Sequence, residues 1–267
     1  MKQRIITGVA GALILIAVLV LGSPFIQAAI LILSLIAVHE LVHAVQLSYK
    51  KNLMITAVAA TAVMVVVQFF DKSLFLPVLY IYIVALFIIY MICNKSVEFN
   101  DIASVLMITL YVSIMFGHLI YIWGMHNGHM LIWLVFVCAF MTDTFAMLGG
   151  KFFGRYKLCP YLSPKKTVEG SLCGVIGCVL CVAVYCVICR VFFSAHPYYL
   201  NAFIVGLGAS IVSQTGDLAA SCIKRQFGIK DYGKIMPGHG GVMDRFDSVL
   251  FVAPFIYYVL YIFPIFA

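Results

Sequence analysis

LFLPVLYIYIVALFIIYMIC, residues 74–93, is a run of twenty residues without a charged side chain. About 20 apolar residues are enough to cross the hydrocarbon core of a bilayer as an α-helix, so this stretch predicts a transmembrane helix. Similar apolar runs lie on both sides of it, at approximately residues 5–22, 24–47, 53–70, 101–122, 129–150, 168–193, 198–222 and 247–266. The sequence therefore predicts an all-α, polytopic membrane protein with about nine transmembrane helices.

The composition of the whole chain agrees with a membrane environment. Of the 267 residues, 64% are hydrophobic and 10% are charged, and the mean hydropathy is +1.11, whereas soluble domains average roughly 45–50% and 25%. The connections between the apolar runs are too short to fold separately. We therefore expect a single membrane domain over residues 1–267, with N-terminal helices in 1–139 and, in 140–267, the helices and cytoplasmic loops that contain the candidate functional residues described below.

The cationic residues are distributed unevenly between the two sides that nine spans define. Fifteen of the 17 Lys and Arg residues fall on the side of the N-terminus, and only Lys72 and Arg190 fall on the other. Because cytoplasmic loops carry an excess of Lys and Arg, we expect the N-terminus, and any active site that the chain contains, to face the cytoplasm.

Residues 223–247 differ most from the rest of the chain, because they are rich in glycine and in charged residues. The cations are Lys224, Arg225, Lys230, Lys234 and Arg245, the acids are Asp231, Asp244 and Asp247, and the glycines Gly238, Gly240 and Gly241 surround His239. Glycines let backbone amides approach an anion closely, and cationic side chains neutralise phosphate charge. The pattern favours a phosphate site, since a basic loop that only attracts anionic lipid needs neither the aspartates nor the glycines.

A second loop, residues 151–170, ends in the sequence SPKKTVEG at 163–170. Ser163 or Thr167 is expected to cap the following helix, whose N-terminal amides favour a phosphate group. Lys165 and Lys166 would reinforce this preference. A capped helix beside two lysines is also a common cytoplasmic anchor, so the loop supports a phosphate site without proving one.

Two aspartates interrupt the predicted transmembrane helices. Asp143 lies in the run 129–150 and Asp217 in the run 198–222, where a central aspartate costs about 2.5–3.5 kcal/mol. Each is expected to face a partner or a polar cavity. Ser221 and Lys224 follow Asp217 at helical spacing, so the three share one helix face that leads into the glycine-rich segment. Asp217 and Asp244 are candidate ligands of a shared divalent cation; an interhelical hydrogen bond is the alternative role for each intramembrane aspartate.

The chain resembles the phosphatidate cytidylyltransferase (CDP-diacylglycerol synthase) family at these positions. The C-terminal signature is matched by Ser221, Lys224, Arg225, Lys230, Asp231, Gly233, Pro237, His239, Gly240, Gly241, Asp244, Arg245 and Asp247. A second block is matched by Asp143, Phe145, Ala146, Gly150, Gly154, Arg155, Ser163, Pro164, Lys166, Glu169 and Gly170. The chain departs from the family at Phe140, where Trp is common, and at Met147, where Tyr is frequent, and neither change removes a charged group.

The resemblance implies a nine-helix enzyme that converts CTP and phosphatidate to CDP-diacylglycerol and pyrophosphate and that requires Mg²⁺. It implies that Asp217 and Asp244 hold the metal and that Ser221 and Lys224 line the catalytic site. The residues expected to bind nucleotide and phosphate are Ser163, Lys165, Lys166, Arg225, Lys230, Lys234, His239, Gly240, Gly241 and Arg245, and the supporting acids are Asp143, Asp231 and Asp247. Membrane lipids complete the expected partners in a bacterial plasma (inner) membrane. No nucleic acid is expected, and a homodimer is left open.

Three other functions have some support in the sequence. His39-Glu40-Leu41-Val42-His43 has the HExxH spacing of zinc proteases, although no Asp-Gly pair offers a third ligand. Intramembrane aspartates also occur in transporters. The nearest alternative is a CTP-dependent enzyme that acts on a polyprenyl or other isoprenoid lipid, since lipid-facing residues do not reveal the acyl chain.

Overall fold

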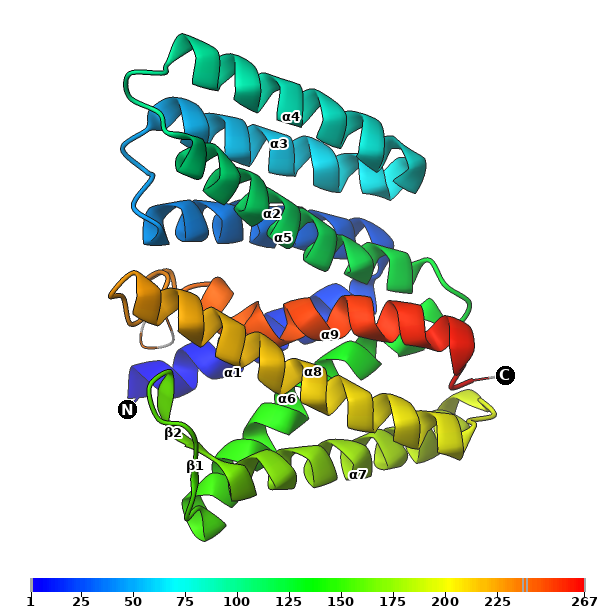
Figure 1. Ribbon diagram of the computed structural model, residues 1–267. Coiled ribbons are helices and arrows are strands. Elements are labelled where there is room, and N and C mark those ends of the chain that lie inside the picture. Colours follow the sequence, from blue (N-terminus) through cyan, green and yellow to red (C-terminus); the bar gives the residue numbers. More distant parts are fainter. Residues whose placement is uncertain (1, 237, 239, 267) are drawn as a thin grey trace. The chain divides into compact units, whose positions relative to one another are not determined.

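The computed structural model describes residues 2–236, 238 and 240–266, with side chains from residue 6 onward. Its elements are α1 (Lys2–Leu21), α2 (Ser23–Ala44), α3 (Lys51–Phe70), η1 (Lys72–Leu74), α4 (Phe75–Ile92), α5 (Phe99–Trp123), α6 (Gly128–Phe153), β1 (Lys157–Cys159), β2 (Ser163–Thr167), α7 (Val168–Phe193), α8 (Tyr199–Gln226) and α9 (Met243–Ile262) (Figure 1). The α-helical class is confirmed.

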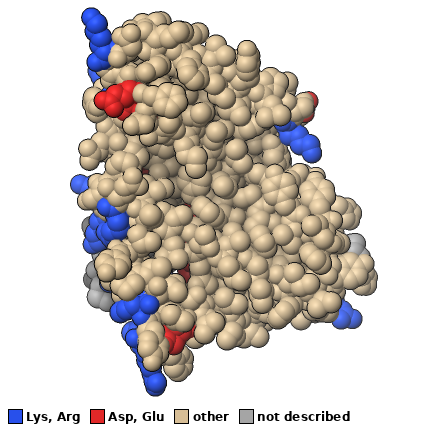
Figure 2. Space-filling view, viewed as in Figure 1, with Lys and Arg blue, Asp and Glu red and all other residues tan. Residues whose placement is uncertain are grey.

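Eight helices within the described part of the chain are long and apolar enough to cross a membrane, and a shorter apolar helix, Ile6–Leu21, occupies the first predicted span. The protein is therefore a multi-pass membrane protein, and the predicted number of nine is approximate. Large apolar side chains on these helices are exposed, among them Phe70, Ile92 and Phe192. Most of the visible surface in Figure 2 lacks charged side chains, as expected for helices that face hydrocarbon.

The helix ends differ from the predicted ones in the charged segment. Helix α8 continues to Gln226 and α9 begins at Met243, so that both Lys224 and Asp244 lie on helices. The connecting segment is therefore shorter than the 25 residues at 223–247 that the composition marked as distinct.

The chain divides into two compact units. The first comprises Met1–Ile120 and Phe227–Arg245, and the second comprises Tyr121–Gln226 and Phe246–Ala267. Each unit combines segments from before and after residue 140, the boundary expected within a single membrane domain. That single-domain organisation stays a prediction.

Polar side chains join the helices of the first unit inside its apolar core. The Tyr82 hydroxyl of α4 lies 2.9 Å from Thr109 Oγ1 of α5, and both side chains are buried. Gln68 of α3 donates to the Ser113 carbonyl oxygen of α5 at 3.3 Å. Such hydrogen bonds hold transmembrane helices together where water cannot satisfy polar groups.

Glycines allow α6 and α7 to pack closely in the second unit. A Cβ atom at Gly177 would lie 2.2 Å from Phe145 Cγ, and one at Gly174 would lie 3.0 Å from the Thr142 carbonyl oxygen. Small residues are typical of such tight contacts between transmembrane helices. Thr142 also donates to Ser210 Oγ at 3.0 Å, which joins α6 to α8.

A short antiparallel hairpin of β1 and β2 connects α6 to α7 (Figure 1). Thr167 is the N-cap of α7, since its Oγ1 accepts from the Gly170 amide at 3.1 Å. Glu169 accepts from the Arg155 amide at 3.0 Å and from the Tyr156 amide at 3.2 Å. The hairpin is thereby fixed to the first turn of α7.

Candidate active site

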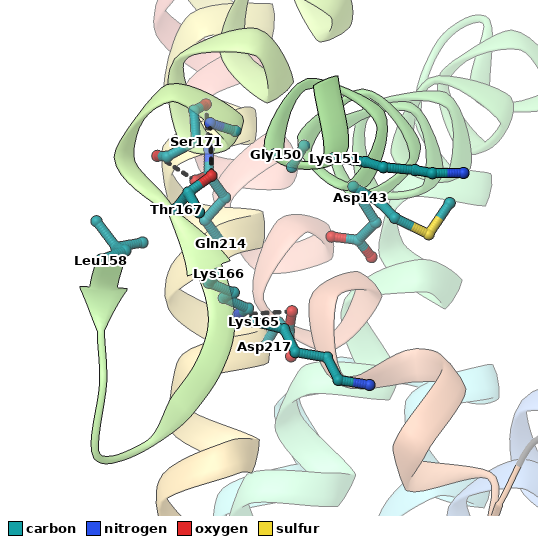
Figure 3. A pocket seen from close by; sticks show the side chains of 13 residues that line it. Asp143, Gly150, Lys151, Leu158, Lys165, Lys166, Thr167, Ser171, Gln214 and Asp217 are labelled. Atoms are coloured by element: carbon teal, nitrogen blue, oxygen red, sulfur yellow. Dashed lines mark hydrogen bonds and ion pairs between the residues drawn. The ribbon is translucent and has the colours of Figure 1, made fainter. Parts of the chain in front are cut away.

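The second unit contains a cavity of about 340 Å³ that is lined by the hairpin and by helices α6, α7 and α8. A volume of this size falls in the range of small-molecule sites. The polar residues that line it are Asp143, Lys151, Lys165, Lys166, Thr167, Ser171, Gln214 and Asp217 (Figure 3). Four of the residues that the sequence predicted, Asp143, Lys165, Lys166 and Asp217, are therefore brought together.

Lys166 and Asp217 form an ion pair in this cavity. Lys166 Nζ on β2 lies 2.6 Å from Asp217 Oδ2 on α8, and the two side chains are 24% and 31% exposed. The cation from the loop and the carboxylate from the transmembrane helix, which the sequence suggested separately, are thus direct partners. An intramembrane aspartate with a cationic partner beside a cavity is typical of a functional site.

Asp143 points from α6 into the same cavity (Figure 3). Its Oδ2 accepts from Ser248 Oγ of α9 at 3.1 Å. Asp247, the residue before Ser248, is buried, and the charged groups of Asp217, Asp143 and Lys224 lie within electrostatic range of it. Carboxylates from α6, α8 and α9 therefore gather in one region of the second unit.

A close approach of α8 and α9 accompanies this acidic cluster. A Cβ atom at Gly216 would lie 2.7 Å from the Asp247 carbonyl oxygen and 3.0 Å from the Phe251 ring. Glycine at 216 therefore lets the two helices meet next to Asp217.

The oxygen donors of this cluster fit a hard divalent cation. Among the described residues, no three His, Cys, Asp or Glu side chains are placed to form a complete metal cage. Mg²⁺ usually binds to only one or two carboxylates and completes its shell with waters and substrate phosphates, so a small number of carboxylates suits it. The chemistry of Asp217 and of the carboxylates around it is compatible with such a site.

Two uncharged polar residues of the cavity, Ser171 and Gln214, were not predicted from the sequence. Ser171 of α7 donates through its hydroxyl to Gln214 Oε1 of α8, and Gln214 Nε2 donates to the Ser171 carbonyl oxygen at 3.3 Å. Gln214 precedes Asp217 by three residues, and this spacing puts both on one face of a helix. That spacing was the signal that could have identified Gln214.

Backbone amides of the glycine-rich segment, which belongs to the first unit, are engaged by the protein itself. Asp244 Oδ2 accepts from the Tyr232 amide at 2.8 Å and from the Gly241 amide at 3.0 Å. The Gly240 amide donates to the Met236 carbonyl oxygen at 3.1 Å, with Gly240 at a φ of 88°. The anion that two of these amides approach is thus a carboxylate of the same segment.

The other predicted residues lie on the same elements or their flanks. Ser221 is buried on α8, Lys224 is half-buried and Arg225 is exposed, and Arg225 Nε donates to the Leu162 carbonyl oxygen of the hairpin at 3.3 Å. Ser163 is half-buried on β2. Among the predicted residues that belong to the first unit, Lys230, Asp231, Lys234 and Arg245 are exposed. His239 lies outside the described residues.

The HExxH pattern does not assemble into a protease-like site. His39 and His43 are exposed on α2, whereas Glu40 is 3% exposed and accepts from the amides of Val242 and Met243. The carboxylate that would activate water in a zinc protease is therefore buried against another helix.

Comparison with known sequences finds relatives that share one name and that align with nearly the whole chain. The sequence profile of the cytidylyltransferase family matches residues 2–263. The chain is 33% identical over 260 residues to a phosphatidate cytidylyltransferase of Staphylococcus epidermidis, covering 95% of this chain and 96% of the relative. It is 30% identical over 274 residues to that of Bacillus subtilis, covering 98% of each, and 33% identical over 257 residues to that of Staphylococcus aureus, covering 95% and 96%.

Proposed function

The chain belongs to the cytidylyltransferase family, and from this premise we propose that it joins CTP to phosphatidate, forming CDP-diacylglycerol and pyrophosphate. The observation that carries the proposal is the cavity of the second unit, where Lys151, Lys165 and Lys166 lie beside Asp143 and Asp217. The relatives are named for the same reaction. A cavity with several cations and a few carboxylates suits two phosphate-bearing substrates.

The reaction needs charge neutralisation more than it needs a base. A phosphate monoester with a second pKa near 6 is mostly dianionic at neutral pH, so the phosphatidate oxygen attacks without a dedicated general base. The new bond joins this oxygen to the α-phosphorus of CTP. The bond from that phosphorus to the oxygen between the α- and β-phosphorus breaks, and this oxygen leaves as a terminal oxygen of pyrophosphate. The repulsion between the two anions is the main barrier that the protein must lower.

The chain's own cations supply part of that neutralisation in the proposal. Lys165 and Lys166 extend from a hairpin that Glu169 and Arg225 hold in place, so their ammonium groups are positioned before substrate arrives. Fixed positive groups stabilise the charge that develops on the leaving pyrophosphate without reorganisation. Arg225, Lys230, Lys234, His239 and Arg245 stay proposed phosphate-binding residues, and Lys224 stays proposed to line the catalytic site.

We propose Asp217 and Asp244 as the carboxylates that hold Mg²⁺, with Asp143 and Asp247 as supporting acids. When bound, the ion supplies Lewis-acid stabilisation of the phosphate oxygens. Gly240 and Gly241 contribute by shaping the turn that presents Asp244, since their amides donate within the segment. Ser221 lies one helical turn after Asp217 and is proposed to line the same site.

The proposed orientation places the hairpin at the cytoplasmic surface of the bacterial plasma (inner) membrane. Its support is the excess of Lys and Arg in the hairpin and in the segment before α9. CTP would then reach the site from the cytoplasm, and phosphatidate would reach it from the inner leaflet.

The direct test is a substrate panel with the purified protein. Phosphatidate and Mg²⁺ are incubated with CTP, ATP, GTP or UTP in turn, and lipid extracts are analysed for a liponucleotide. We expect CDP-diacylglycerol with CTP and little product with the others. A liponucleotide from a polyprenyl phosphate, with none from phosphatidate, would assign the chain to the isoprenoid substrate instead.

A further inference from the structure

Glu40 is a buried acid of α2 whose carboxylate binds the start of α9. Its Oε1 accepts from the Val242 amide at 3.1 Å, and its Oε2 accepts from the Met243 amide at 2.9 Å. These amides are more than 200 residues away in the chain. The first amides of a helix have no partner within the helix, and an anion near them is favourable. Glu40 therefore caps α9 from another helix of the first unit.

The space that Glu40 occupies accounts for two glycines of the signature segment. A Cβ atom at Gly233 would lie 2.2 Å from Glu40 Oε1, and one at Gly241 would lie 2.3 Å and 2.4 Å from the two carboxylate oxygens. Neither glycine has a positive φ, so backbone conformation does not require glycine at these positions. The requirement is instead room for the Glu40 carboxylate.

Glu40 and Asp244 hold the same turn from two sides. The Gly241 amide donates to Asp244 at 3.0 Å, and the next two amides, at Val242 and Met243, donate to Glu40. The three consecutive donors are thereby divided between two carboxylates. Any movement of Glu40 would change the start of α9, and Asp244 is the second residue of that helix.

We propose that Glu40 is a positioning residue for the transfer reaction, because it fixes the turn at residues 241–243 and hence the direction of the Asp244 side chain. The inference rests on the proposed function, in which Asp244 acts in catalysis. It gives the glutamate of the HExxH pattern a role in the cytidylyltransferase itself, independent of the exposed His39 and His43. It also explains Gly233 and Gly241, because glycine at these two positions leaves room for the Glu40 carboxylate.

The first test compares Glu40→Ala and Glu40→Gln with the wild-type protein. The alanine variant removes both acceptors, and the glutamine variant keeps one acceptor but turns an N–H group toward the other amide. Loss of a group that orients a site residue typically lowers activity by roughly 10- to 100-fold. We expect kcat to fall in this range for Glu40→Ala and less for Glu40→Gln, with the KM for phosphatidate little changed. Glu98→Gln, at an exposed glutamate of the same unit, is the matched control and should behave as wild type.

The second test asks whether Glu40 is the reason for glycine at 241. Gly241→Ala is expected to lower kcat when Glu40 is present, because the added methyl group meets the carboxylate. In the Glu40→Ala background the same change should cost little more, so that the two effects are not additive. If kcat of the double variant instead falls by the product of the two single losses, Gly241 serves another purpose and the proposed coupling is overturned.

A third measurement is independent of activity. Lys230 and Lys234 are exposed in the segment that Glu40 secures, so trypsin should cleave there faster in folded Glu40→Ala and Glu40→Gln proteins. Cleavage after Lys157 in the hairpin provides an internal standard. Unchanged cleavage at Lys230 and Lys234 together with wild-type kcat would refute the inference. If the wild-type protein itself makes no liponucleotide, the proposed function fails, whereas the cleavage result still decides whether Glu40 holds the segment.

Discussion

Asp217 of α8 contacts the hairpin, because Lys166 of β2 pairs with its carboxylate. Gln214, which also lines the cavity, precedes Asp217 by about one turn of the same helix. The pair places a cation and a carboxylate beside the cavity before any substrate is bound. A metal-binding role would draw the Asp217 carboxylate toward the ion and leave Lys166 to pair with a substrate phosphate.

Asp217→Asn is predicted to lower turnover by about 100-fold or more, because an electrostatic contribution to the transition state of this kind is worth roughly two to three orders of magnitude. The variant should still insert into membranes and purify as a monodisperse protein, since the residue is partly exposed. Turnover is measured as CDP-diacylglycerol formed with saturating Mg²⁺. Asp71→Asn, which changes an exposed aspartate next to η1, is the control. Near-wild-type turnover of Asp217→Asn would remove this carboxylate from its proposed role.

Of the residues that line the cavity, the charged ones are those that the sequence could identify as candidates. Asp143 and Asp217 stand out in apolar helices because of their insertion cost, and Lys165 and Lys166 stand out by their spacing before a helix cap. Ser171 and Gln214 were not identified, because an uncharged polar residue costs little free energy in a transmembrane helix and is therefore no signal of a site. Glu40 was assigned to an HExxH pattern because its partners, Val242 and Met243, are remote in sequence and only the fold brings them near.

Helix packing in the second unit depends on glycines that tolerate no side chain. At Gly177 the nearest atoms to an added Cβ are Phe145 Cγ and Cβ, at 2.2 and 2.5 Å. The Phe145 Cβ is fixed to the backbone of α6, so a rotation of the ring does not relieve the contact. Gly11 of α1 offers a contrast, since an added Cβ would meet no atom within 4 Å.

Gly177→Ala is therefore predicted to destabilise the protein, while Gly11→Ala is predicted to be neutral or stabilising. Both changes gain helix propensity of up to about 1 kcal/mol, so the difference between them isolates the contact between α6 and α7. Overpacking of this kind typically costs about 1–3 kcal/mol. The measurement is the midpoint of thermal unfolding in detergent. Equal midpoints for the two variants would contradict the close packing of α6 and α7.

The long helices could be predicted from the sequence, but the hairpin could not. Runs such as 74–93 and 168–193 are long and apolar, and helices of similar bounds, α4 and α7, occupy them. Strands β1 and β2 have only three and five residues, and β2 is the charged, proline-containing sequence SPKKT, which has no strand pattern of alternating apolar residues. Capping of α7 was predictable because Thr167 is a short hydroxyl residue directly before an apolar run.

At the scale of the whole molecule, the distribution of Lys and Arg predicts the orientation in the membrane. Fifteen of the 17 cations fall on one side of the predicted spans, and positive charge is retained on the cytoplasmic side. The cations of the hairpin belong to this group. The orientation and the access of CTP to the cavity are therefore linked.

A cysteine at Tyr161 is predicted to react with a membrane-impermeant maleimide only after the plasma membrane is permeabilised, because Tyr161 is 95% exposed on the hairpin. A cysteine at Lys72, which falls on the opposite side, should react in intact cells. Labelling of each variant is compared with that of the parent protein, whose native cysteines include the exposed Cys222. Labelling of Tyr161→Cys in intact cells would place the hairpin on the outer side.

The fate of the individual phosphates of CTP tests the proposed reaction most directly. The wild-type protein is incubated with phosphatidate, Mg²⁺ and CTP that carries a radioactive phosphorus at either the α or the γ position. We predict that the α label enters the lipid extract as CDP-diacylglycerol and that the γ label stays in water as pyrophosphate. Transfer of the γ label to lipid, or an aqueous α label with intact phosphatidate, would contradict cytidylyl transfer by this protein.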